Sequence, residues 1–263
     1  MILWTDGEHD PAENMRRDAL LLAAAEAGAP PVLRLFGFRP HGITLGRLQR
    51  AEQALDLARC TADEIPWAQR PTGGRAIFHA EEWTFSLAAP LDDPKWGGSA
   101  AESYGSLAAL IARALRSLGV PAELARGARR AAESRAVLAT AACFAASARH
   151  EILANGHKLV GLAQRRTRAG LLLQGSILLG AGHLRLADYV AGPAEERASV
   201  RRNLACVTAL AAKWLPAAAS LAGFSEAIAA LLPPGCTRVQ GEAGCYLLAL
   251  DEARSYTALD FAN

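Results

Sequence analysis

The chain has 263 residues, enough for one large domain or two small ones, and 51% of them are apolar. Its net charge of +2 is too small to indicate a nucleic-acid or membrane partner. No apolar run reaches the roughly 18 to 20 residues of a membrane span, and the N-terminus lacks the pattern of a signal peptide. We therefore expect a cytoplasmic globular protein. No repeat or composition break divides it, so a single domain over 1–263 is expected.

The first part of the sequence predicts a helix and then a hairpin. The helix is expected over about 11–27, because Pro11 suits a first helical turn and Gly28 suits a helix end. Residues 32–49 alternate between apolar and other side chains around a Pro-containing turn, which predicts two paired strands.

The middle and the end of the chain mix strands and helices. The pattern predicts, in order, a short helix over 51–65, strand segments around a glycine turn within 66–90, an amphipathic helix over 99–120, a hairpin turn at Asn155-Gly156, a strand over 170–179 and mainly helix over 183–232. The segment 125–147, rich in small and basic residues, is expected to be partly loop. This order favours an α+β fold with a mixed or largely antiparallel sheet.

The stretch RPTGGRAIFH, residues 70–79, has two interpretations. Arginines and glycines at the start of an apolar strand could form a loop that holds an acyl carbonyl, a carboxylate or a phosphate. The candidate ligand-binding residues of this loop are Arg70, Gly73, Gly74, Arg75 and His79. The alternative is a plain hairpin turn whose arginines face solvent.

Two further residues carry candidate chemistry. Lys158 lies in an apolar strand after a tight turn, where Gly161 and Ala163 would leave room for a ligand beside it. An edge-strand lysine that prevents aggregation is the alternative. Cys143 is a candidate nucleophile if a cation or oriented N–H groups lower the pKa of its thiol. Otherwise it is a small buried apolar residue, as the other cysteines are expected to be.

Several classes of site are excluded by spacing. The five cysteines form no CxxC pair, which argues against a disulfide framework and a zinc site. No HExxH motif is present, so no metal is expected, and the absence of a GxSxG elbow disfavours a Ser-His-Asp hydrolase.

Five segments, taken in order, resemble the lipoate/biotin attachment superfamily. They are AENMRRDALL, ITLGRLQRAEQALDL, RPTGGRAIFHAEEWTFSLAAP, GHKLVGLAQRR and LLLQGSILL, within about residues 1–195. The resemblance implies a biotin/lipoate ligase-like catalytic domain, a mixed, mostly antiparallel sheet flanked by helices. Cys143-Phe144, shortly before the lysine hairpin, is similar to the ligase-like octanoyltransferases that use a cysteine.

The resemblance also implies a mechanism. Octanoyl would pass from acyl carrier protein to Cys143 as a thioester, and then to the lysine of a lipoyl domain or glycine-cleavage H protein. Lys158 would lower the thiol pKa and stabilise the oxyanion, while Ile77 and Leu159 would contact the acyl chain beside the glycine-rich loop and Gly161. Neither a cofactor nor an oligomer is expected. An ATP-dependent lipoate ligase, an amidotransferase between lipoyl proteins and a non-catalytic scaffold remain alternatives.

The sequence departs from the family pattern at two places near the residues of the expected mechanism. The family strand usually reads Gln-His-Gly-Ser, whereas the chain has Gln174-Gly175-Ser176, without the histidine. The residues that follow Cys143-Phe144 are Ala145-Ala146-Ser147 where that group often has Asp-Ala-Pro.

Overall fold

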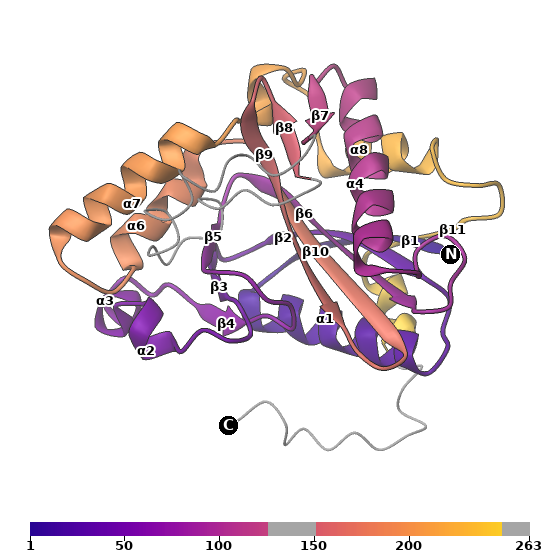
Figure 1. The fold of residues 1–263 in the computed structure, drawn as a ribbon, viewed down its shortest axis with the longest axis horizontal. Helices are drawn as coiled ribbons and strands as arrows, with labels where there is room; N and C mark the ends of the chain where they lie inside the picture. Colours follow the sequence, from indigo (N-terminus) through magenta and orange to yellow (C-terminus); the bar gives the residue numbers. More distant parts are fainter. Residues whose placement is uncertain (126–150, 249–263) are drawn as a thin grey trace.

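The fold is built on a central eight-stranded sheet. A computed structural model describes residues 1–125 and 151–248 (Figure 1). The sheet runs in the order β11 (Thr237–Gln240), β1 (Ile2–His9), β2 (Val32–Phe38), β6 (Glu82–Pro90), β10 (Gly170–Leu178), β9 (His157–Arg166), β8 (Ile152–Ala154) and β7 (Ala122–Leu124). The β11–β1 and β1–β2 pairings are parallel and the other five are antiparallel. The predicted mixed, mostly antiparallel sheet is confirmed.

A second sheet has three strands, in the order β4 (Trp67–Gln69), β3 (Gly42–Leu45) and β5 (Ile77–His79). The predicted hairpin over 32–49 is therefore wrong, because β2 and β3 belong to different sheets. Every residue of β2 is buried, and both of its edges are occupied by β1 and β6. A fully buried strand of this kind is stable in the centre of the large sheet, where both faces are covered, and its one charged residue, Arg34, is paired with buried carboxylates.

Helices cover both faces of the large sheet (Figure 1). Side chains alternate along a strand, so Leu33 and Leu35 of β2 pack with α4 (Ala100–Ser117) and α8 (Leu221–Ala229) on one face. On the other face Val32 packs with Leu21 and Leu22 of α1 (Pro11–Glu26).

Four further helices and a 3-10 segment lie beside the small sheet. They are α2 (Ala51–Ala54), α3 (Leu57–Ala62), α6 (Leu186–Tyr189), α7 (Ala194–Val207) and the 3-10 segment Ala181–Arg185. The 3-10 segment Gly241–Leu247 packs on β1 and β11 of the large sheet, and Ala211 of the 3-10 segment Ala211–Lys213 belongs to the core on the α4 face. The region 183–232 is mainly helical, as expected, and it is divided into several separate helices. Among the helices of the described ranges, none is both long and apolar enough to cross a membrane.

Local signals account for the elements that were predicted correctly. Helix α1 begins with the side chain of Asp10 accepting a hydrogen bond from the N–H of Glu13. Helix α4 begins with a capping box between Ser99 and Glu102. The turn at Asn155-Gly156 joins β8 and β9 as an antiparallel hairpin, which places Lys158 near the start of β9.

Candidate active site

A narrow cavity lies where α1, the large sheet and the small sheet meet. Its volume is about 30 Å³. Four of the predicted site residues are among its walls. The lining residues are Met15, Phe36, Phe38, Thr44, Arg70, Ile77, His79, Thr84, Gly161, Leu162, Ala163, Gln174, Gly175 and Ser176.

Strand register explains why Gly161 and Ala163 contribute to this cavity. Gly161 pairs with Ser176 and Ala163 pairs with Gln174 across the β9–β10 ladder. Residues that pair directly point to the same face of a sheet, so all four lie on the cavity side. The small residues Gly161 and Ala163 of β9 leave a space above the sheet. The larger side chains of Gln174 and Ser176 of β10 border this space. Both residues of β9 line the cavity, and their role in making room for a ligand stays a prediction.

The loop of residues 70–75 is held together by Arg70. Its buried guanidinium donates to the carbonyl oxygens of Gly73, Arg75 and Thr44 at 2.8–3.2 Å. Gly74 has a φ of +95°, the left-handed region that favours glycine. Only Arg70 of this loop lines the cavity, while Gly73, Gly74 and Arg75 shape the loop behind it.

The same loop lies against Gly46, at the end of β3. A Cβ atom at Gly46 would lie 2.0 Å from the carbonyl oxygen of Gly74, and the N–H of Arg47 donates to the carbonyl of Thr72 at 2.9 Å. We expect Gly46→Ala to force these backbones apart and to lower the free energy of unfolding by about 1–3 kcal/mol. Urea unfolding monitored by fluorescence measures this change in the free energy of unfolding.

Gly73→Ala is the matched control, because a Cβ at Gly73 meets nothing within 4 Å and its φ is not positive. Its free energy of unfolding should change by less than about 0.5 kcal/mol. Equal losses in the two variants would contradict the close packing of Gly46 on Gly74.

Lys158 is buried and paired with an acidic residue. Its Nζ donates to Glu151 Oε1 at 2.5 Å, and the two side chains are 8% and 3% exposed. Burying an ammonium group is costly unless a carboxylate accompanies it, so Glu151 makes this position possible. The position is not the exposed edge-strand lysine of the alternative interpretation. Lys158 does not line the cavity itself and lies three residues before Gly161 on β9.

Cys143 lies outside the described residues, in the segment 126–150 that connects β7 to β8. The two ends of this segment meet, because the N–H of Ala125 donates to the carbonyl of Glu151 at 2.8 Å. The chain thus leaves and re-enters the described part beside the Lys158–Glu151 pair.

Four other cysteines are free in the described ranges. Burial raises the pKa of the Cys60 thiol, and Asp56 and Asp63 add to this effect. Burial and a hydrogen bond to Glu242 raise the pKa of the Cys245 thiol. Both thiols are therefore weaker nucleophiles than an ordinary cysteine at neutral pH.

Gln174 occupies the region of the strand where the family histidine is missing. The β10 strand pairs without interruption from Gly170 to Leu178 with β6, so no gap is present. The Gln174 amide donates to Asp18 Oδ2 at 2.6 Å and accepts from the Thr72 hydroxyl at 2.6 Å. It thereby connects the glycine-rich loop to α1. Sequence reasoning missed this role, since its partners are 156 and 102 residues away.

Other cavity residues were also missed or misplaced. Thr44, Ser176 and Met15 were not predicted, although Thr44 and Ser176 are hydroxyl residues within apolar strands, a pattern that indicates a polar site. Ile77 lines the cavity as expected. Leu159 is instead fully buried in a hydrophobic cluster that includes residues of α4.

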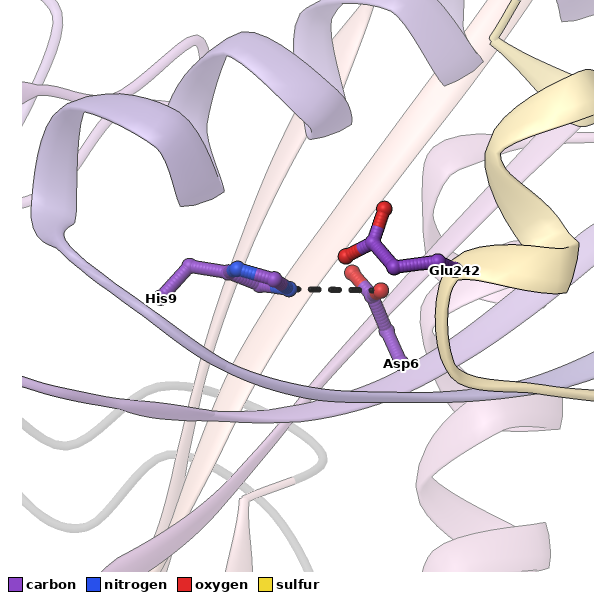
Figure 2. Close-up of side chains that lie close together, drawn as sticks. All are labelled: Asp6, His9 and Glu242. Atoms are coloured by element: carbon purple, nitrogen blue, oxygen red, sulfur yellow. Dashed lines mark ion pairs between the residues drawn. The ribbon is translucent and has the colours of Figure 1, made fainter.

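One cluster of potential metal ligands is present in the described ranges. The ligand atoms of Asp6, His9 and Glu242 lie within 4.8 Å of one another, and His9 Nε2 is 3.3 Å from Asp6 Oδ1 (Figure 2). Arg17 donates to both carboxylates, and Arg34 donates to Asp6 at 2.6 Å. Since two guanidinium groups already compensate this negative charge, the cluster is an ion-pair network.

The sheet arrangement and the cavity define a class of protein. The fold is that of lipoate–protein ligases. This chain superposes with a TM-score of 0.70 on a chain from the structure of a bipartite lipoate protein ligase and its E2 lipoyl domain from the archaeon Thermoplasma acidophilum. The two chains are 16% identical, and the match covers 99% of this chain and 94% of the other.

The chain belongs to the lipoyl protein ligase A/B catalytic domain family, whose model matches residues 10–230. It is 35% identical over 241 residues to the octanoyltransferase LipM of Kyrpidia tusciae, and the match covers 87% of each chain. It is 41% identical over 174 residues to the octanoyltransferase LipM of Moorella thermoacetica, or 66% of this chain and 63% of that protein. The family predicted from the sequence and its assignment as an acyltransferase enzyme are confirmed.

Proposed function

We propose that the chain is an octanoyltransferase that moves an octanoyl group from acyl carrier protein to the lysine of a lipoyl domain, through a thioester on Cys143. The observation that carries this proposal is the buried Lys158, held by Glu151 where the segment with Cys143 joins the sheet. Relatives named octanoyltransferase, 31–41% identical over most of the chain, support the reaction type.

The reaction has two steps. The Cys143 thiolate attacks the incoming thioester, and the carrier thiolate leaves. The lysine amine then attacks the new thioester and leaves with the octanoyl group as an amide. A thioester is already an activated acyl group, so the exchange requires no ATP. The amide is more stable than the thioester, which makes the second step favourable.

Lys158 would serve both steps through its positive charge. An ammonium beside the thiol stabilises the thiolate, and beside the carbonyl it stabilises the developing oxyanion. One such donor typically lowers the barrier by about 3 kcal/mol. The pairing with Glu151 keeps Nζ in a fixed direction, so the charge is oriented before the substrate arrives.

The cavity would hold the acyl chain. Its apolar walls include Met15, Phe36, Ile77 and Leu162. The methionine side chain is flexible, so it can move aside when a chain one methylene wide enters. Each buried methylene contributes about 0.8 kcal/mol, so an eight-carbon chain would be favoured over a four-carbon chain by roughly 3 kcal/mol.

We also propose that residues 1–263 form one catalytic domain. The pairing of β11 with β1 supports this, since it places a strand from near the end of the chain in the same sheet as the first strand. A monomer in the cytoplasm that requires no cofactor belongs to the same proposal.

The test uses the whole chain, octanoyl-loaded acyl carrier protein and an apo-lipoyl domain, without ATP. The expected result is octanoylation of the lipoyl lysine, and a mass gain of one octanoyl group on the chain when the acceptor is omitted. Butyryl-loaded carrier is the control and should react at least about tenfold more slowly. Strict ATP dependence would indicate a ligase instead, and transfer only from an octanoylated H protein would indicate an amidotransferase.

A further inference from the structure

His79 is the centre of a chain of three buried side chains. Its Nε2 lies 2.7 Å from the hydroxyl oxygen of Thr44, and its Nδ1 lies 2.6 Å from Oε1 of Glu82. Thr44 is fully buried, and the side chains of His79 and Glu82 are 4% and 2% exposed. Both Thr44 and His79 line the cavity. The chain therefore runs from the cavity wall to a carboxylate behind it.

The carboxylate of Glu82 indicates where the ring proton lies. A carboxylate only accepts hydrogen bonds, so the Nδ1–H of His79 donates to Glu82 Oε1. In the tautomer with its proton on Nδ1, Nε2 is an acceptor and receives the hydrogen bond of the Thr44 hydroxyl. The Thr44 oxygen also accepts from Arg70 at 3.3 Å. The accepting nitrogen of this tautomer lies on the cavity side.

The surroundings keep this orientation. Phe38 stacks on the His79 ring with centroids 3.9 Å apart and an interplanar angle of 13°. Glu82 Oε1 also accepts hydrogen bonds from the hydroxyl groups of Thr84 and Ser176. Its Oε2 is buried, with no hydrogen-bond partner among the described residues. A buried carboxylate behind the ring would stabilise the imidazolium that forms when Nε2 takes up a proton.

We propose that His79 is the general base of the amide-forming step, with the Thr44 hydroxyl as its proton relay and Glu82 as its positioning residue. This inference rests on the proposed function. The first step exchanges one thiolate for another and releases no proton. The second step consumes an amine that must lose a proton as it becomes an amide, so only this step requires a base.

The proposed step is balanced in atoms and charge. The amine nitrogen of the acceptor lysine forms a bond to the thioester carbon, and the carbon–sulfur bond breaks with its electron pair on Cys143. The nitrogen gives a proton to Thr44 Oγ1 while the Thr44 hydroxyl proton passes to His79 Nε2. The imidazolium then returns its proton to solvent, and the thiolate is regenerated for the next cycle.

The experiment separates the two steps with His79→Gln. Because His79 also lines the cavity, acyl-enzyme formation from octanoyl-loaded carrier is allowed to change, but it should be slowed at least about tenfold less than the second step. Transfer from the isolated acyl-enzyme to apo-lipoyl domain, followed by rapid quench and intact mass, should be about 10²–10⁴-fold slower. Free imidazole should accelerate this transfer in His79→Gly at least about tenfold. His41→Gln, an exposed histidine just before β3, is the control and should change neither step.

Two threonine variants test the relay without removing the ring. Thr44→Val should slow the second step about as much as His79→Gln, whereas Thr44→Ser should preserve it within about fivefold. For Glu82, the second step should be slowed in Glu82→Gln and partly restored in Glu82→Asp, with the first step unaffected in both. Circular dichroism and unfolding curves show whether each variant is folded.

Equal slowing of both steps, or no imidazole rescue in a folded His79→Gly, would overturn the role of His79. An unchanged second step in Thr44→Val would overturn the relay. If the natural chain forms no acyl-enzyme at all, the proposed function fails and this inference fails with it. That outcome differs from an acyl-enzyme that forms normally and transfers equally well with and without His79, which would overturn the inference alone.

Discussion

Replacing Cys143 by serine is expected to abolish the thioester adduct and to lower octanoyl transfer at least about 10³-fold. A serine hydroxyl forms no appreciable anion at neutral pH, and Lys158 cannot compensate for this difference in acidity. The measurement is intact mass of the chain after incubation with octanoyl-loaded carrier, followed by the rate of acceptor octanoylation. The variant should show neither the mass gain nor the transfer.

Two other cysteines provide controls for this result. Cys206 is exposed, and Cys60 is buried with a pKa that burial raises, so neither is expected to form the thioester. Cys206→Ser and Cys60→Ala should keep the mass gain and at least about half of the activity, provided that Cys60→Ala remains folded. A thioester adduct that persists in Cys143→Ser, or that disappears in Cys206→Ser, would contradict the assignment.

Arg34→Met should be the most destabilising single change in the polar network beneath α1, lowering the free energy of unfolding by about 3–5 kcal/mol. Arg34 is fully buried and donates to Asp6 at 2.6 Å, to Asp18 at 2.8 Å and to the side chain of Asn14 at 2.6 Å. Both carboxylates are completely buried. Removing the guanidinium group leaves Asp18 without its cation, because its other donors, Ser86 and Gln174, are neutral.

The measurement for Arg34→Met is urea unfolding at neutral pH. The control is Arg39→Met, because Arg39 is 82% exposed and its pairing with Glu8 is long, at 3.7 Å. It should change stability by less than about 0.5 kcal/mol. Adding Asp18→Asn to Arg34→Met should recover about 1–2 kcal/mol by removing the uncompensated charge. A loss below about 1 kcal/mol in Arg34→Met would contradict the importance of this network.

The elements that the sequence predicted well have local causes. The Asn155-Gly156 turn, the Pro11 helix start and the amphipathic pattern of α4 depend on residues close together in the chain. The wrong hairpin between β2 and β3 has the opposite cause. Its turn and its alternation are genuine, but the pairing partners of β2 come from β1 and β6, and no local pattern specifies them.

The candidate site shows the same division. Gly161, Ala163, Arg70 and His79 were predicted to surround a ligand and line one cavity, whereas the site roles of Lys158 and Cys143 remain predictions. What the sequence could not reveal is the use of Arg70. Its guanidinium fastens its own loop to β3, a role that depends on the distance between backbones and not on residue type.

Gln174 is a second example. The sequence drew attention to it only because the histidine that usually follows it is missing, yet its amide joins Thr72 to Asp18 across three separate regions of the chain. A polar residue in an apolar strand signals that such partners exist, but only the assembled sheet identifies them.

The parallel pairing of β11 with β1 has a consequence for how the protein is made. Strand β1 is synthesised long before β11, so its outer edge stays unpaired until residues 237–240 have been made. Until then its unpaired N–H and C=O groups can bind a strand of another molecule. The outer edge of β1 is therefore open to aggregation while most of the described chain is being made, and the four-residue strand β11 is what closes it.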